Sequence, residues 1–149
     1  MSEARRPSAP APGAPVGAGG ERQVAGGFFL HVAPAILYVL AIFYAGSVEQ
    51  GPEIQVELVA QDKLLHLVAF FGMQLTMFRA ARWKLFELGT GRLALIALAL
   101  TSAVGASLEF WQATLPYRSA EFADWVADVL GAGLAALLLR LVYGRNAPG

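Results

Sequence analysis

The chain has 149 residues, of which 56% are hydrophobic and only 15% charged, and its mean hydropathy is +0.53. Soluble domains carry about a quarter of their residues as charged side chains, so this composition indicates a surface that largely faces lipid. The net charge of zero excludes a basic nucleic-acid surface. The absence of cysteine excludes disulfides and thiolate metal sites, and two histidines are too few for a histidine-based zinc site. We therefore expect neither a metal nor a cofactor.

The N-terminal segment is rich in Pro, Ala, Gly and Ser and contains Arg5 and Arg6. Such a composition cannot bury enough apolar surface to fold. We expect residues 1–22 to be a disordered cytoplasmic tail and residues 23–145 to be a membrane domain.

The first predicted span is the uncharged stretch between Gln23 and Val48. A bilayer core needs about 20 apolar residues, which places a span at about residues 26–47. The stretch is longer than the roughly 7–15 apolar residues of a signal-peptide core, so we expect it to be retained. Pro34 should kink this helix, and neighbouring helices can accommodate the kink.

Three further uncharged runs are each too short to cross a bilayer alone. They cover residues 64–78, 93–108 and 129–139. Each reaches about 20 residues when it is extended from its basic end. The predicted spans are then 63–82, 92–113 and 124–143. All three carry polar residues at the same end, which indicates an all-α bundle of four transmembrane helices with a polar end.

The distribution of basic residues predicts the orientation. Nine of the eleven Lys and Arg residues lie in the N-terminal tail, the loop between the second and third spans, and the C-terminus. Cytoplasmic loops carry an excess of Lys and Arg. We therefore expect a multi-pass cell-membrane protein with both termini in the cytoplasm and the polar end outside. Residues 52–62 fit either a short interfacial amphipathic helix or an early start of the second span.

The second and third spans contribute polar side chains to this end. Asp62, Lys63 and His66 open the second span, with Asp62 and His66 one helical turn apart on one face. Glu109 and Gln112 share a face at the end of the third span. The presence of Lys63 at the end of a span, taken alone, is most simply explained by snorkelling: its long aliphatic side chain lets the charged group reach the membrane interface.

The fourth span carries a stripe of Asp124, Asp128 and Gly131, spaced i, i+4 and i+7, and Arg118 lies in the loop before it. We expect this stripe to face inward and the helix to meet a neighbour along Gly131 and Ala135, where small side chains permit close approach. Because these groups lie at a common depth, we expect the polar residues of the three spans to form one site with Arg118. Arg118 is then the expected counterion of Glu109 and Asp124.

Two segments of the chain resemble the VanZ-like family: DKLLH at residues 62–66 and LEFWQATLPYRSAEFADWVADVLG at residues 108–131. The family pattern has Asp-Lys then His in one helix, Glu with Gln three residues later, Pro-x-Arg, and then Asp, Asn and Gly. The matching positions are Asp62, Lys63, His66, Glu109, Gln112, Pro116, Arg118, Asp124 and Gly131. The resemblance covers about residues 63–143 and implies four spans.

Two positions depart from the pattern. Asp128 stands where the family usually has Asn, and Ala135 stands where a second Gly is common. The acid keeps the shape of the amide but adds a titratable charge. The family takes its name from a teicoplanin-resistance protein, so the resemblance implies a role at the cell envelope related to resistance, and it implies no particular reaction.

The polar residues admit several functions. Ionisable side chains inside spans usually mark function, although a network that only fixes helix register is the alternative. We favour an accessory protein whose pocket binds the polar or anionic head group of a lipid, a lipid-linked sugar or a lipoglycopeptide, because Arg118 suits an anion. A membrane enzyme with His66 as general base near Asp62 or Glu109, and a small proton-coupled transporter, are the other two hypotheses. Whether the chain forms a homo-oligomer stays open.

Overall fold

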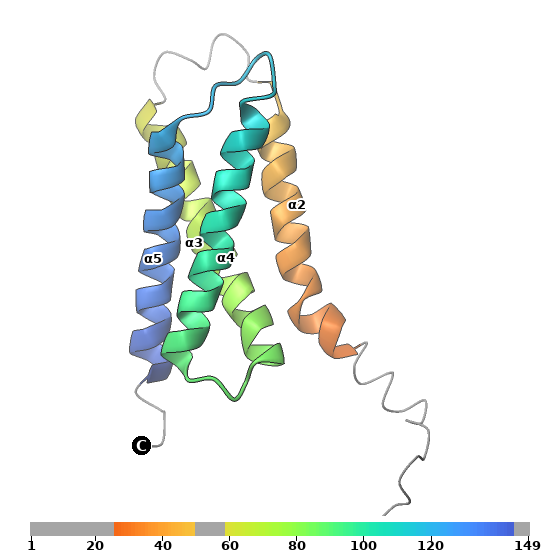
Figure 1. Ribbon diagram of the computed structural model, residues 1–149, viewed down its shortest axis with the longest axis vertical. Coiled ribbons are helices and arrows are strands. Elements are labelled where there is room, and N and C mark those ends of the chain that lie inside the picture. The colour runs from red at the N-terminus through yellow and green to blue at the C-terminus, as the bar shows by residue number, and fades with distance from the viewer. Residues whose placement is uncertain (1–25, 50–58, 145–149) are drawn as a thin grey trace, which may run out of the picture.

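The computed structural model describes residues 26–49 and 59–144, and within these ranges all regular structure is helical (Figure 1). The long elements are α2 (Ala33–Ser47), α3 (Val59–Lys84), α4 (Thr90–Gln112) and α5 (Phe122–Tyr143). Residues 26–31 form a further helical segment ahead of α2. We call the end that holds the N-termini of α3 and α5 the upper end, as it is drawn. The predicted tail and most of residues 52–62 lie outside the described ranges.

Three helices are long and apolar enough to cross a membrane: Asp62–Lys84 of α3, Thr90–Gln112 of α4 and Phe122–Tyr143 of α5. These bounds agree with the predicted spans to within a few residues. The early start of α3 at Val59 absorbs the end of the ambiguous segment before it.

The first predicted span is interrupted near Pro34. The helical segment over residues 26–31 is followed by a turn at Val32. Helix α2 then begins at Ala33, with Pro34 in its first turn. Proline has no N–H, so it is tolerated best where a helix begins and its N–H would have no partner. The Val32 N–H still bonds to the Phe28 carbonyl at 2.8 Å, and the Val32 carbonyl accepts from Ile36 at 3.2 Å. The two pieces therefore stay in near continuity.

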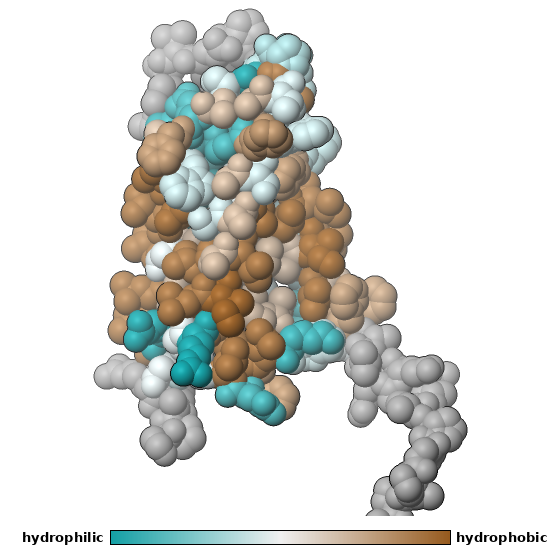
Figure 2. Space-filling view, viewed as in Figure 1, coloured by the Kyte–Doolittle hydropathy of each residue, from teal (hydrophilic) through white to brown (hydrophobic). Residues whose placement is uncertain are grey.

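The helices bury two small apolar clusters. One lies between α3, α4 and α5 toward the lower end and consists of Phe78, Leu93, Ala94, Ala97, Ala136 and Leu139. The other lies higher and consists of Phe70, Met73 and Leu108, with Tyr38, Val39 and Ile42 of α2 packed against it. Much of the remaining apolar surface faces outward, including Phe29, Leu37, Leu95 and Leu134. Figure 2 shows a mostly apolar middle region between two more polar ends, as expected for a protein in a bilayer.

The backbones of α3 and α5 touch at Gly131. A Cβ atom placed on Gly131 would overlap the carbonyl of Leu67, which is backbone and cannot rotate away. Ala135, one turn further along α5, is fully buried. The predicted inward stripe is confirmed, because Asp124, Asp128 and Gly131 are all buried.

The upper ends of α2 and α3 diverge, whereas their lower halves meet (Figure 1). Below, the Tyr38 hydroxyl donates to the Ala69 carbonyl at 3.0 Å, and the His31 and Trp83 rings stack at 5.9 Å. Above, α2 is attached to α4 instead, since Trp111 Nε1 donates to Ser47 Oγ at 2.9 Å. A wedge-shaped space between α2 and α3 therefore lies at the upper end, and α4 lines it as well through Leu108 and Gln112.

The contact at Gly131 gives a matched test within one helix. We expect Gly131→Ala to destabilise the protein by about 1–3 kcal/mol or more, because the added methyl overpacks a backbone contact. Gly133→Ala should be neutral or stabilising, since a Cβ atom there meets nothing within 4 Å and alanine favours the helix. Thermal unfolding of the detergent-purified variants measures both. Equal stability of the two variants would contradict the packing.

Candidate functional site

Lys63 links α3 to the start of α5 through two carboxylates. Its Nζ lies 2.6 Å from Asp124 Oδ1 and 3.0 Å from Glu121 Oε2. The Asp124 side chain is only 8% exposed, whereas that of Glu121 is 52% exposed. An ion pair gains more when its charges are shielded from water, so the bond to Asp124 is the stronger of the two.

His66, one turn below Lys63, pairs with Asp128, one turn below Asp124. The His66 Nδ1 to Asp128 Oδ1 distance is 2.8 Å, and the Asp128 side chain is completely buried. The other carboxylate oxygen of Asp128 lies against Gly105 of α4, where a Cβ atom would approach it to 2.7 Å. The glycine therefore makes room for an acid in the centre of the bundle.

Glu109 lies on α4, one turn above Gly105, and is 9% exposed. Its Oε2 accepts a hydrogen bond from the backbone N–H of Glu121 at 2.9 Å, which holds the loop before α5 against α4. Gln112, also buried, donates through Nε2 to the Gly46 carbonyl of α2 at 3.3 Å.

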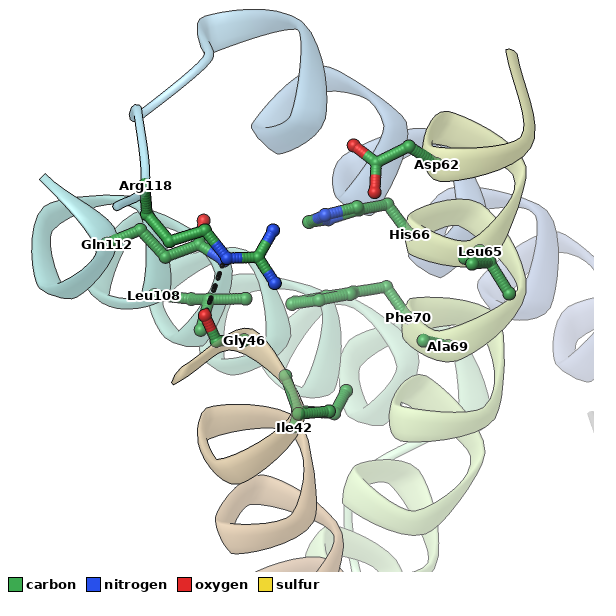
Figure 3. A pocket seen from close by; sticks show the side chains of 11 residues that line it. Ile42, Gly46, Asp62, Leu65, His66, Ala69, Phe70, Leu108, Gln112 and Arg118 are labelled. Atoms are coloured by element: carbon green, nitrogen blue, oxygen red, sulfur yellow. Dashed lines mark hydrogen bonds between the residues drawn. The ribbon is translucent and has the colours of Figure 1, made fainter. Parts of the chain in front are cut away.

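Arg118 extends from the loop between α4 and α5 across the wedge toward α3. Its Nη2 donates to the Val48 carbonyl at 3.1 Å. Figure 3 shows its guanidinium group directed toward the side chains of His66 and Asp62 on α3. Arg118 thus belongs to the same end of the molecule as the buried acids, as the sequence predicts.

A cavity of about 170 Å³ occupies the wedge. Its polar lining is Asp62, His66, Gln112 and Arg118, and its apolar lining includes Ile42, Leu65, Ala69, Phe70 and Leu108. Leu65, which is 67% exposed, is one of the residues on its α3 side.

A larger cavity, of about 670 Å³, lies at the lower end and is lined by basic and aromatic side chains. Two of these are already engaged with neighbours. Arg79 Nε donates to His31 Nδ1 at 3.3 Å, and Arg82 lies over the Tyr143 ring. None of the predicted site residues lines this cavity.

The structure places the eight predicted site residues at one end, but it pairs them differently from the sequence-based expectation. Lys63 does not extend to the interface alone, because it forms an ion pair with Asp124. The cation beside Asp124 is therefore Lys63 and not the expected Arg118. His66 lies near both Asp62 and Glu109, as expected, with a side-chain oxygen of each acid within 4.8 Å of a ring nitrogen. Its hydrogen bond, however, goes to Asp128. Glu121 was not predicted as a site residue. Its only signal in the sequence is a position three residues before Asp124.

A family model described as VanZ/LLP1 matches residues 29–143 of the chain. The chain belongs to this family. The match spans every helix from α2 to α5 and confirms the resemblance seen in the sequence. Comparison with curated proteins and with solved structures gave no significant match.

The two ion pairs of Lys63 should differ in strength. In a double-mutant cycle with Lys63→Met and Asp124→Asn, we expect a coupling of about 1–3 kcal/mol in the free energy of unfolding. The same cycle with Glu121→Gln should give about 0.2–1 kcal/mol, because that carboxylate is exposed. Unfolding in mixed micelles measures all variants. A coupling to Glu121 as large as that to Asp124 would show that burial does not decide the strength of this network.

Proposed function

We propose that this VanZ/LLP1-family membrane protein binds the anionic, phosphate-sized head group of a membrane lipid or lipid-linked molecule, in an accessory role at the cell envelope. The observation that carries the proposal is the mixed lining of the upper cavity. Charged and amide side chains line it together with aliphatic and aromatic ones, and Figure 3 shows Arg118 directed toward His66 and Asp62, with Phe70 and Ile42 below them. A lipid likewise combines a polar head group with an apolar chain, so it could contact both kinds of lining residue.

The polar groups suit an anion that also carries hydroxyls. Arg118 offers a planar, permanently charged fork that matches the oxygens of a phosphate. His66 and Gln112 can donate hydrogen bonds, and Asp62 can accept them from a hydroxyl or an ammonium group.

The size of the cavity limits what it encloses. Pockets for drug-sized molecules measure about 300–1,000 Å³, so a cavity of about 170 Å³ accommodates a head group and little more. A lipid-linked sugar or a lipoglycopeptide would place its anionic group here, and its acyl chains would leave the cavity past apolar lining residues such as Leu65.

A purely structural network should be closed and fully paired. Within the described residues, two buried carboxylate oxygens lack a hydrogen-bond partner, Asp128 Oδ2 and Glu109 Oε1. An unpaired polar atom in a low-dielectric site costs about 1–3 kcal/mol. These two atoms argue against a closed network that only sets helix register. Neither Asp128 nor Glu109 lines the cavity, so the head-group proposal is supported by the cavity and not by these oxygens.

A membrane hydrolase is the second candidate, and the pair formed by His66 and Asp128 favours it. A buried carboxylate that accepts from one imidazole nitrogen leaves the other nitrogen available as a general base, and His66 lines the cavity. Release of phosphate or alcohol from a phospholipid by the wild type, and not by His66→Gln, would support this candidate over simple binding.

We further propose that residues 26–47, the first predicted span, cross the membrane in addition to α3, α4 and α5, and that the upper end is extracytoplasmic. These 22 residues rise about 33 Å as a helix, enough for a bilayer core. The basic asymmetry of the loops supports the orientation.

Lipid mass spectrometry of the detergent-purified protein tests the binding function. We expect Arg118→Ala to reduce the co-purified anionic lipid at least about tenfold, which corresponds to losing about 1.4 kcal/mol of a charge-assisted bond. Arg140→Ala is the matched control, because Arg140 is exposed at the lower end and should retain the lipid. Equal lipid content in all three proteins would refute the proposal.

The orientation is testable because the chain contains no cysteine. A cysteine introduced by Tyr117→Cys should react with a membrane-impermeant thiol reagent in intact cells. A cysteine introduced by Lys84→Cys should react only after the cells are opened. The reverse pattern would invert the topology.

A further inference from the structure

The buried groups at the upper end of the bundle include a three-residue cluster drawn from three helices: His66 of α3, Glu109 of α4 and Asp128 of α5. Each can place one ligand atom within 4.8 Å of the ligand atoms of the other two. Asp128 is completely buried and Glu109 is 9% exposed. Two carboxylates this close repel each other strongly when both are ionised, unless a positive charge lies between them.

The hydrogen bonds within the cluster are incomplete. Asp128 Oδ1 bonds to His66 Nδ1 and Glu109 Oε2 bonds to the Glu121 N–H. Asp128 Oδ2 and Glu109 Oε1 are buried and have no such partner in the part of the chain that is described. Each of the two carboxylates in the cluster thus has one buried oxygen that no described group satisfies.

The separation of His66 and Asp128 is compatible with a shared divalent cation. Adjacent ligands on an ion with bonds of about 2.1 Å lie about 3 Å apart at right angles, and His66 Nδ1 is 2.8 Å from Asp128 Oδ1. One imidazole with two carboxylates is a donor set that suits manganese, iron or zinc, and the chain has no cysteine to favour softer ions.

We infer that His66, Glu109 and Asp128 bind a divalent first-row cation, with the remaining coordination positions open to water or to a ligand. This departs from the sequence-based expectation of no metal. One histidine with carboxylates can hold a hard divalent ion, but a single sequence does not show which acids the fold brings to His66. The inference does not depend on head-group binding. If both hold, the cation lies behind His66, at the edge of the anion-binding cavity.

The test is titration of the chelator-treated, full-length protein in detergent with Mn²⁺, followed by electron paramagnetic resonance. We expect one ion per chain. Asp128→Asn should weaken binding by more than the roughly 10–100-fold that follows from losing an outer-shell partner. This variant is isosteric with the native side chain, so it should fold. Glu109→Gln should have the same effect. Glu87→Gln, which changes an exposed acid at the lower end, should have none.

A second measurement does not depend on whether the site variants fold. Pulsed spectra of bound Mn²⁺ should show coupling to one imidazole nitrogen in the wild type and equally in His31→Gln, which removes the other histidine. Absence of stoichiometric binding, absence of nitrogen coupling, or loss of that coupling in His31→Gln would each overturn the inference. Failure here with lipid binding intact would leave the head-group proposal standing, and the converse result would leave the cation site standing.

Discussion

The closeness of α3 and α5 sets the geometry of the whole upper end. At Gly131 the backbones of the two helices are in direct contact. The space between them is too small even for a Cβ atom, which would overlap the Leu67 carbonyl group. Two turns above this contact Lys63 reaches Asp124, and one turn above it His66 reaches Asp128. Short aspartate side chains can form such bonds only between helices that are packed this closely. Gly131 therefore allows the two polar pairs to form, and the pairs in turn fix the register of α3 against α5.

Much of this arrangement was predictable from the sequence, and the reason is geometric. Apolar runs bounded by basic residues determine where helices begin and end, so α4 and α5 were placed to within two residues. Helical periodicity determines which side chains share a face, so the inward stripe of Asp124, Asp128 and Gly131 was also predictable. Depth follows from the rise per residue. These are properties of single helices.

The pairing of the charged groups could not be predicted in the same way. Which acid meets Lys63 depends on the rotation and crossing of α3 against α5, and neither quantity is encoded in the periodicity of one helix. The loop before α5 adds Glu121 to the network through its backbone N–H as well as its carboxylate. The sequence correctly placed Arg118 at the upper end. The estimated depth of each group in the membrane, however, did not reveal that Lys63 is the cation that pairs with Asp124. Pairs of side chains, unlike faces of helices, require the tertiary structure.

The divergence of α2 from α3 affects how a ligand would arrive. Under the proposed function, a ligand anchored in the same leaflet would enter the wedge between α2 and α3 and reach Arg118 by lateral diffusion, without leaving the bilayer. Its supply is then set by its mole fraction among the surrounding lipids and not by its concentration in water. A site of this kind can remain occupied with a modest intrinsic affinity, and it would respond to changes in the lipid composition of the membrane around it.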